Sequence, residues 1–206
     1  FASEMVVKAS LLKMRACEVP TTLFPDGRGR PSHLRRWRDG WRHLRFMLLY
    51  SPRWLFFYPG IFLMISGVLI SLWLLPSPRQ VGKMVFDIHT LLYGAFAILV
   101  GYQILLFAIY TKIFAIAEGL LPQDEKLNKI FKYINLEIGI VAGTVLSVAG
   151  IAGSVYSVWF WQRSGFGPLN PSEMLRMIIP SIIALMLGIQ TIFSSFFLSV
   201  LGMKRK

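Results

Sequence analysis

The chain has 206 residues, of which 55% are hydrophobic and only 16% are charged, and its mean hydropathy is +0.58. An ordinary soluble domain is about 25% charged, so this composition excludes a water-soluble globular fold. The formal net charge is +12, and residues 1–53 hold 11 of the 22 lysines and arginines against four acids. The basic part and the most apolar part are therefore different regions.

The first 31 residues combine a helical pattern with a strand pattern. In FASEMVVKASLLKMRA, apolar side chains recur along one side of a helix, at Phe1, Met5, Ala9, Leu12 and Ala16. The next stretch, CEVPTTLF, has the β-branched content of a short strand. One helix and one strand cannot enclose a core, and the chain begins with Phe. We expect residues 1–31 to end a larger soluble domain, or to dock onto a separate partner that carries one.

Residues 30–46, RPSHLRRWRDGWRHLRF, contain six arginines and two tryptophans. Such a segment can bind nucleic acid, lie on a membrane, or hold a phosphorylated substrate. On a helix, one face collects Leu34, Trp37, Trp41, Leu44 and Leu48. A stripe roughly 110° around from it collects Arg35, Arg38, Arg42 and Arg45.

This geometry favours the membrane surface, because Trp and Leu can enter the headgroup boundary while Arg stays among lipid phosphates. Nucleic acid is not expected as a partner, since the tryptophans belong to the apolar face and no nucleic-acid fold surrounds them. Residues 32–53 are therefore predicted to form juxtamembrane amphipathic helices, although Gly40 disfavours one unbroken helix. The simplest interpretation is an anchor without a specific ligand.

Residues 54–203 contain four stretches long enough to cross a hydrocarbon core, which takes about 20 apolar residues in a helix. They run over about 54–75, 84–117, 138–161 and 174–201. The second is long enough to tilt or to project beyond the bilayer. Between the second and third, residues 124–134 are predicted to form a short interfacial helix, because Leu127, Ile130, Phe131 and Ile134 share a face apart from three lysines. A basic loop helix without a ligand remains the alternative.

Small residues mark one face of the third span, at Gly139, Gly143, Ser147, Gly150 and Ser154, and predict close packing on another helix. This face also leaves room for a homo-oligomer. Pro180 is expected to kink the fourth span. The ionisable residues Asp87, His89 and Glu137 lie near span ends. Because transport and proton relay use ionisable groups deep in the membrane, these positions argue against a transporter.

The orientation follows from the lysines and arginines that flank the spans, which cytoplasmic loops retain. If the N-terminus is cytoplasmic, that side holds 18 of them and the other side holds only Arg79, Lys83, Arg163 and Arg176. We therefore predict a protein of the cytoplasmic (inner) membrane with both termini inside. Cys17 would then lie in a reducing compartment, where no disulfide is expected.

The order FASEM, EVP, PDGRGRPSHL, DGWRHLRF and then a span resembles the end of a family 2 glycosyltransferase of the polyprenyl-phosphate type, similar to dolichyl-phosphate mannose and glucose synthases. The resemblance is specific over Phe1 to about Gly60 and architectural beyond it. It implies that residues 1–31 are a helix and strand remnant of a GT-A catalytic domain with its active-site loop. The predicted fold class is an all-α membrane protein in which this remnant and amphipathic interfacial helices precede four transmembrane helices.

The resemblance implies an inverting reaction in which a nucleotide sugar gives its sugar to the phosphate of a membrane polyprenol. In the family, the loop after the EVP strand supplies basic contacts to phosphates, and arginine pairs bidentately with phosphate oxygens. The implied lipid-phosphate ligands are Arg28, Arg30, Arg35 and Arg36, with membrane-interface roles for Trp37, Trp41, Arg38, Arg42 and Arg45. Relatives typically read Arg-x-x-Gly-x-Ser-Lys in this loop, whereas Pro31, Ser32 and His33 follow Arg30 here.

Family members hold the diphosphate through a divalent cation (Mg or Mn) on an Asp-x-Asp motif that lies upstream. The 206 residues contain no Asp-x-Asp, and His33, His43 and His89 do not cluster with carboxylates at metal-ligand spacing. No catalytic residue or metal site is therefore expected in this segment, which we predict to be inactive alone. Two other classes remain open. One is a non-catalytic membrane module that docks a separate transferase or translocates a lipid-linked sugar, and the other is an unrelated small polytopic protein.

Overall fold

The computed structural model describes residues 5–6, 9–10, 12–22, 24, 36–51, 53–118, 136–168 and 170–202. Its secondary structure consists of α2 (Arg36–Tyr50), the π-helix η1 (Arg53–Phe57), α3 (Tyr58–Leu74), β1 (Arg79–Val81), β2 (Met84–Phe86), α4 (Ile88–Ala117), α6 (Leu136–Arg163) and α7 (Pro171–Gly202). The predicted interfacial helix at 124–134 lies outside the described residues.

Among the described residues, four helices are long and apolar enough to cross a membrane, which confirms the predicted all-α membrane fold. They cover Arg53–Leu74, Ile88–Ala117, Leu136–Arg163 and Pro171–Gly202. Helices suit these sequences because a helix satisfies its own backbone polar groups, as a bilayer requires. At 30 residues, α4 is about 45 Å long, which exceeds a hydrocarbon core of about 30 Å. It must therefore tilt or extend beyond the core.

The predicted start of the second span at residue 84 is wrong. Met84–Phe86 form strand β2, which pairs antiparallel with β1, and the helix begins only at Ile88. A two-residue turn at Gly82 and Lys83 joins the strands, and Gly82 has a φ of +60°. Glycine adopts this conformation without a steric penalty, which favours a tight hairpin. Apolarity alone could not separate these strand residues from the helix that follows.

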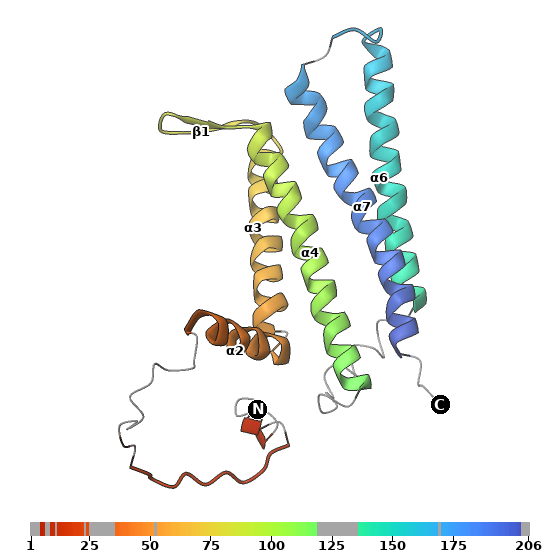
Figure 1. Ribbon diagram of the computed structural model, residues 1–206. Coiled ribbons are helices and arrows are strands. Elements are labelled where there is room, and N and C mark those ends of the chain that lie inside the picture. The colour runs from red at the N-terminus through yellow and green to blue at the C-terminus, as the bar shows by residue number, and fades with distance from the viewer. Residues whose placement is uncertain are drawn as a thin grey trace.

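The helices form two antiparallel pairs, α3 with α4 and α6 with α7, and α4 packs against α7 (Figure 1). The order across the bundle is therefore α3, α4, α7, α6. Helix α2 lies at the end of the bundle where α7 finishes, and the β1–β2 hairpin lies at the other end (Figure 1). These are called the α2 end and the hairpin end below.

Close approach of α6 and α7 depends on glycine, as the sequence predicts. A Cβ atom on Gly143 would lie 2.7 Å from the carbonyl oxygen of Gly188 and 2.6 Å from Cγ1 of Ile192. A Cβ on Gly150 would lie 2.5 Å from the backbone nitrogen of Leu185. The small-residue face of the third span is thus confirmed as a helix contact, and it faces α7 of the same chain.

Helices α3 and α4 also approach closely at glycines, which the sequence did not reveal. A Cβ on Gly67 would lie 2.5 Å from the carbonyl oxygen of Gly94, and one on Gly101 would lie 2.8 Å from that of Gly60. Gly60 and Gly67 are seven residues apart, as are Gly94 and Gly101. Seven residues are close to two helical turns, so both glycines of each helix face the same partner.

Hydroxyl groups within the spans are satisfied mainly by the helices that carry them. Ser154, Ser157, Ser181 and Ser195 each donate to the carbonyl four residues earlier, at 2.7–2.9 Å. The Tyr102 hydroxyl on α4, in contrast, bonds to another helix and lies 2.7 Å from Thr191 Oγ1 on α7. Thr191 donates to the Leu187 carbonyl, so Tyr102 is the donor. These serines therefore do not mark a polar pathway.

The N-terminal segment differs from its predicted strand. Cys17–Thr22 and Phe24, the described residues of CEVPTTLF, have no regular secondary structure, and Val19 and Phe24 are largely exposed. A strand requires a neighbour to accept and donate its backbone hydrogen bonds. Among the described residues, the pairing partners are confined to β1 and β2. Within the predicted helix, the described residues Met5, Val6, Ala9 and Ser10 are helical.

Candidate membrane-interface site

The basic tryptophan-containing segment forms helix α2, directly before the first span. Helix α2 runs across the end of α3 rather than continuing its axis (Figure 1). The change of direction occurs around Ser51, which is not helical, and is followed by the π-helical turn Arg53–Phe57. Pro59 then occupies an early position of α3, where a missing N–H costs nothing. The chain thus places α2 beside the bundle end, where the membrane surface would lie.

Three residues of the apolar face predicted for this helix, those whose side chains the structure describes, are exposed. Trp37 is 93% exposed and Trp41 is 62% exposed, and Leu44 is also exposed. A solvent-exposed cluster of this kind marks a surface that meets a membrane or another partner. Because both indoles combine an apolar ring with one polar N–H, they suit the headgroup region of a bilayer.

The arginines of α2 lie beside that face and are also exposed, at Arg38, Arg42 and Arg45. Nη1 of Arg42 lies 3.8 Å from Oδ1 of Asp39, an i,i+3 pair at the surface in which Arg42 is exposed and Asp39 is partly exposed, and such pairs stabilise little. A guanidinium group can donate paired hydrogen bonds to a phosphate. The helix therefore presents exposed apolar rings and exposed guanidinium groups side by side.

The other sequence-predicted ligands are not placed by the structure. Arg28, Arg30 and Arg35 lie outside the described residues. Arg36 is the first residue of α2, and its side chain is likewise outside the description. Their assignment to lipid phosphate stays a prediction from the family resemblance.

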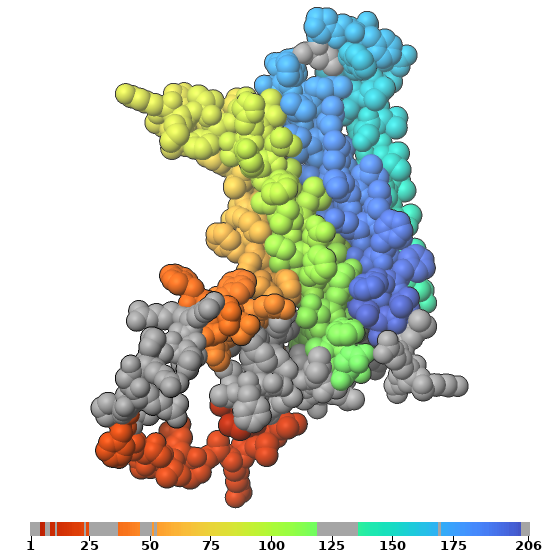
Figure 2. Space-filling model, viewed as in Figure 1, coloured from red at the N-terminus to blue at the C-terminus, as the bar shows by residue number. Residues whose placement is uncertain are grey.

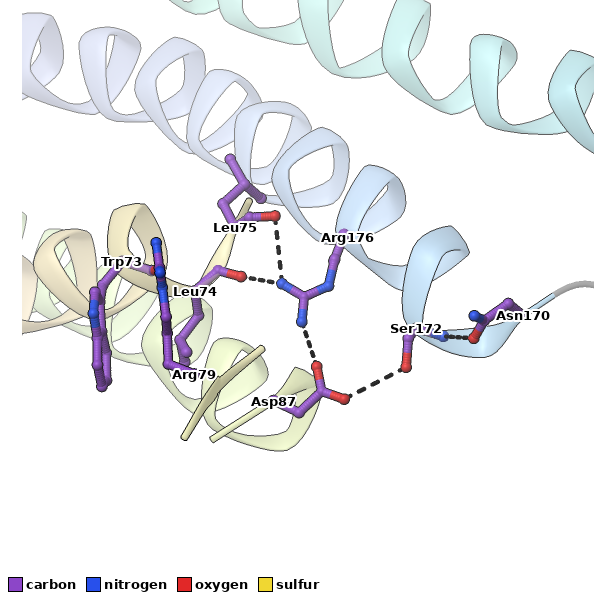
Figure 3. Close-up of polar contacts among 8 residues, drawn as sticks. All are labelled: Trp73, Leu74, Leu75, Arg79, Asp87, Asn170, Ser172 and Arg176. Atoms are coloured by element: carbon purple, nitrogen blue, oxygen red, sulfur yellow. Dashed lines mark hydrogen bonds and ion pairs between the residues drawn. The ribbon is translucent and has the colours of Figure 1, made fainter. Parts of the chain in front are cut away.

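At the hairpin end, the structure reveals a polar cluster that the sequence analysis missed (Figure 3). The Arg176 guanidinium on α7 donates through Nη1 to the Leu74 carbonyl and through Nη2 to Oδ1 of Asp87. Nη1 is also 3.4 Å from the Leu75 carbonyl, and the Ser172 hydroxyl lies 3.5 Å from Oδ2 of Asp87. The Arg176 side chain is 11% exposed and that of Asp87 is 32% exposed.

The cluster complements two helix ends at once. The last carbonyls of α3 lack partners within their helix, and a cation there interacts favourably with the helix dipole. Asp87 occupies the N-cap position of α4, where a negative charge is favourable, but its carboxylate turns to Arg176 rather than to its own helix. Beneath it, Leu74, Leu91, Ala95 and Ile179 form a buried apolar core. Arg176 therefore joins three helices structurally.

The ionisable residues near span ends lie where the sequence predicts. His89 is exposed in the first turn of α4, and Glu137 is exposed in the first turn of α6. In the described part of the chain, His, Cys, Asp and Glu form no group of three that could hold a metal ion.

A bundle of four apolar helices, with an exposed basic helix at one end, has the architecture of a polytopic membrane protein. Comparison with known proteins narrows this class. Residues 109–202 match the profile described as the glycosyltransferase family 2 C-terminal transmembrane region. Residues 109–202 are thus similar to the membrane region of family 2 glycosyltransferases, the family that the sequence resembles.

One curated relative extends the match over almost the whole chain. The low-salt glycan biosynthesis hexosyltransferase Agl6 of Haloferax volcanii is 34% identical over 203 residues, which is 98% of this chain and 47% of the relative. The chain thus spans about half the length of the relative it matches. No solved structure matches the chain.

Proposed function

We propose that this chain is the membrane and acceptor-binding part of a glycosyltransferase that moves a sugar from a nucleotide sugar to polyprenyl phosphate. The observation that carries the proposal is the exposed face of α2, where Trp37 and Trp41 lie uncovered beside Arg38, Arg42 and Arg45. A polyprenyl phosphate has the matching chemistry, because its chain is apolar and its phosphate lies at headgroup depth. The match to the family 2 transmembrane region supports a transferase rather than an unrelated membrane protein.

We infer that the α2 end faces the cytoplasm. Within the described residues, this end carries Arg38, Arg42, Arg45, Arg53 and Lys112. The hairpin end carries four cations, of which Arg176 is paired with Asp87. The excess of positive charge at the α2 end is the pattern of a cytoplasmic face. That placement would bring the acceptor phosphate to the compartment in which nucleotide sugars are made.

In this proposal, the arginines hold and orient the acceptor phosphate while the four spans fix α2 at the membrane surface. Arg28, Arg30, Arg35 and Arg36 would complete the phosphate contacts. The nucleotide sugar and a divalent cation (Mg or Mn) would bind a catalytic domain outside these 206 residues, where the cation would offset the charge of the diphosphate leaving group. An inverting transfer follows from the family resemblance. The segment alone would then be inactive.

The test uses the full-length enzyme in vesicles that contain polyprenyl phosphate. Replacing Arg38, Arg42 and Arg45 together by Gln should raise the KM for polyprenyl phosphate and leave the KM for nucleotide sugar unchanged. Each surface cation contributes about 1 kcal/mol of attraction to anionic lipid, so the rise is at most roughly a hundredfold. Arg163→Gln, an exposed cation at the hairpin end, is the matched control.

Two outcomes would contradict the proposal at different levels. An unchanged KM for polyprenyl phosphate in the triple variant would show that α2 is an anchor without an acceptor role. Absence of transfer to polyprenyl phosphate by the unaltered enzyme, with transfer to another acceptor, would overturn the acceptor assignment itself.

A further inference from the structure

The β1–β2 hairpin stands out sideways from the bundle, beyond the flank of α3 (Figures 1 and 2). Its strands are only three residues long, and Val81, Met84 and Val85 are each more than half exposed. Exposed apolar side chains on so short a hairpin do not contribute to a core. They require a partner outside the part of the chain that the structure describes.

The register sorts the hairpin side chains into two faces. Arg79 is opposite Phe86, Gln80 is opposite Val85, and Val81 is opposite Met84. Because opposed residues share a face and successive residues alternate, one face holds Arg79, Val81, Met84 and Phe86. The other face holds Gln80 and Val85. The first face, which we call the apolar hairpin face, is therefore the more hydrophobic.

Contacts with α3 show which way the apolar hairpin face points. The ring of Phe86 lies 6.0 Å from that of Trp73, measured between centroids, and Nε of Arg79 lies 3.5 Å from the Trp73 carbonyl oxygen. Trp73 is the penultimate residue of α3. The apolar hairpin face contacts it, so this face is directed toward the side of α3. The apolar hairpin face thus overhangs the side of α3.

The surface beneath the overhang is apolar and exposed. Leu69, Ile65 and Phe62 precede Trp73 at helical spacing on the same side of α3, and each is more than half exposed. In a membrane this stripe faces lipid, because α3 is one of the four candidate spans. If α3 spans a bilayer, lipid of the adjoining leaflet would fill the space below the hairpin.

The charge of the hairpin fits the lipid headgroups that would lie there. Arg79 and Lys83 are exposed, and residues 76–86 contain no acidic residue. Asp87, which follows, is engaged by Arg176. A segment with apolar side chains, an adjacent Trp ring and two exposed cations has the composition of an interfacial anchor.

We propose that the β1–β2 hairpin is a second membrane-interface element, which inserts Val81, Met84 and Phe86 among the headgroups of the leaflet at the hairpin end. Its cations bind the anionic phosphates of that leaflet. The bundle is thereby anchored at both surfaces, by α2 on one side and by the hairpin on the other. This inference depends on the four spans and not on the glycosyltransferase reaction.

The test places single cysteines in the full-length chain, with Cys17 and any other native cysteine changed to Ser. An environment-sensitive fluorophore is attached to Val81→Cys or Met84→Cys on the apolar hairpin face. Gln80→Cys and Val85→Cys are matched controls on the opposite face, and Leu69→Cys is the lipid-facing control. The protein is studied in nanodiscs of phosphatidylcholine and phosphatidylglycerol in equal amounts.

Labels at 81 and 84 should emit at shorter wavelength than labels at 80 and 85. They should also lose more fluorescence when lipids carry a quencher near the headgroup. Equal behaviour of the two faces would overturn the proposal, and so would spontaneous disulfide-linked dimers of the 81 and 84 variants, which indicate a second copy as partner. Quenching at 84 should fall in nanodiscs of phosphatidylcholine alone. Unchanged quenching at position 84 would overturn the proposal that the hairpin cations bind anionic phosphates.

Discussion

The guanidinium of Arg176 on α7 donates a hydrogen bond to the Leu74 carbonyl, and Leu74 is fully buried. The same group donates to Asp87 at the start of α4, 89 residues earlier in the chain. One side chain therefore closes the end of α3, pairs with the start of α4 and fixes both against α7. The α4–α7 contact has this polar connection at the hairpin end and the Tyr102–Thr191 bond further along.

Arg176→Met should lower the free energy of unfolding by about 1–3 kcal/mol, because it leaves the carbonyl of Leu74 without its donor. The measurement is loss of helicity during titration of detergent-solubilised protein with sodium dodecyl sulfate. Arg163→Met is the control, since Arg163 is exposed at the same end and stacks 3.8 Å above the Trp159 ring. Equal losses in the two variants would show that the three-helix contact contributes little.

Gly143→Ala should destabilise the α6–α7 pair by about 1–3 kcal/mol, because the added methyl would overlap the Gly188 carbonyl oxygen and helix backbones cannot yield locally. The same detergent titration measures it. Gly202→Ala adds an identical methyl where no atom lies within 4 Å, and its effect should stay within about 0.5 kcal/mol. If Gly143→Ala does not change the free energy of unfolding, α6 and α7 are further apart than the structure shows.

Tyr102→Phe should cost only about 0.6 kcal/mol, the average for a hydrogen bond between transmembrane helices. Thr191 keeps its own bond to the Leu187 carbonyl, so the variant leaves no buried donor unpaired. A double-mutant cycle with Thr191→Val isolates the coupling energy between Tyr102 and Thr191. A coupling energy near zero would show that the 2.7 Å contact does not stabilise the α4–α7 contact.

Replacing Arg28 and Arg30 together by Ala in the full-length enzyme should reduce transfer to the lipid acceptor while nucleotide-sugar affinity stays nearly intact. The reason is that the family resemblance assigns both side chains to phosphate contacts in the active-site loop. Steady-state kinetics with each substrate varied separates the two effects. Unchanged transfer would remove the loop from the acceptor site.

Replacing Trp37 and Trp41 by Ser should weaken the seating of α2 on the membrane and raise the apparent KM for the lipid. Both rings are exposed in the structure, so the change removes apolar area that no described part of the protein covers. Depth-dependent quenching of a label on α2, together with the acceptor kinetics, provides the measurement. An unmoved label would indicate that α2 does not depend on these rings for its position.

Much of the membrane region could be predicted from local sequence. A run of about 20 apolar residues must be helical in a bilayer, so the four spans follow from composition and length. The glycine face of α6 follows from helical spacing, since side chains seven residues apart share a side. The exposed Trp and Arg faces of α2 follow from the same periodicity.

Other features depended on contacts between distant residues. Met84–Phe86 are as apolar as a span, but pairing with Arg79–Val81 makes them a strand. The stretch CEVPTTLF has strand propensity, but its described residues have no pairing strand. Gly60 and Gly67 lie in a uniformly apolar helix, so their spacing alone does not indicate a helix contact. Their role follows from the structure, in which they pack against Gly101 and Gly94 of α4.

The sequence alone determined that this chain crosses a membrane as four helices and presents a basic, tryptophan-bearing helix beside them. Hydropathy and helical period are local properties, and a bilayer permits few alternatives to a helix. Only the tertiary structure decided the order α3, α4, α7, α6, the three-helix contact of Arg176 and the overhang of the hairpin. Each requires atoms from segments far apart in sequence to meet, which no local pattern encodes.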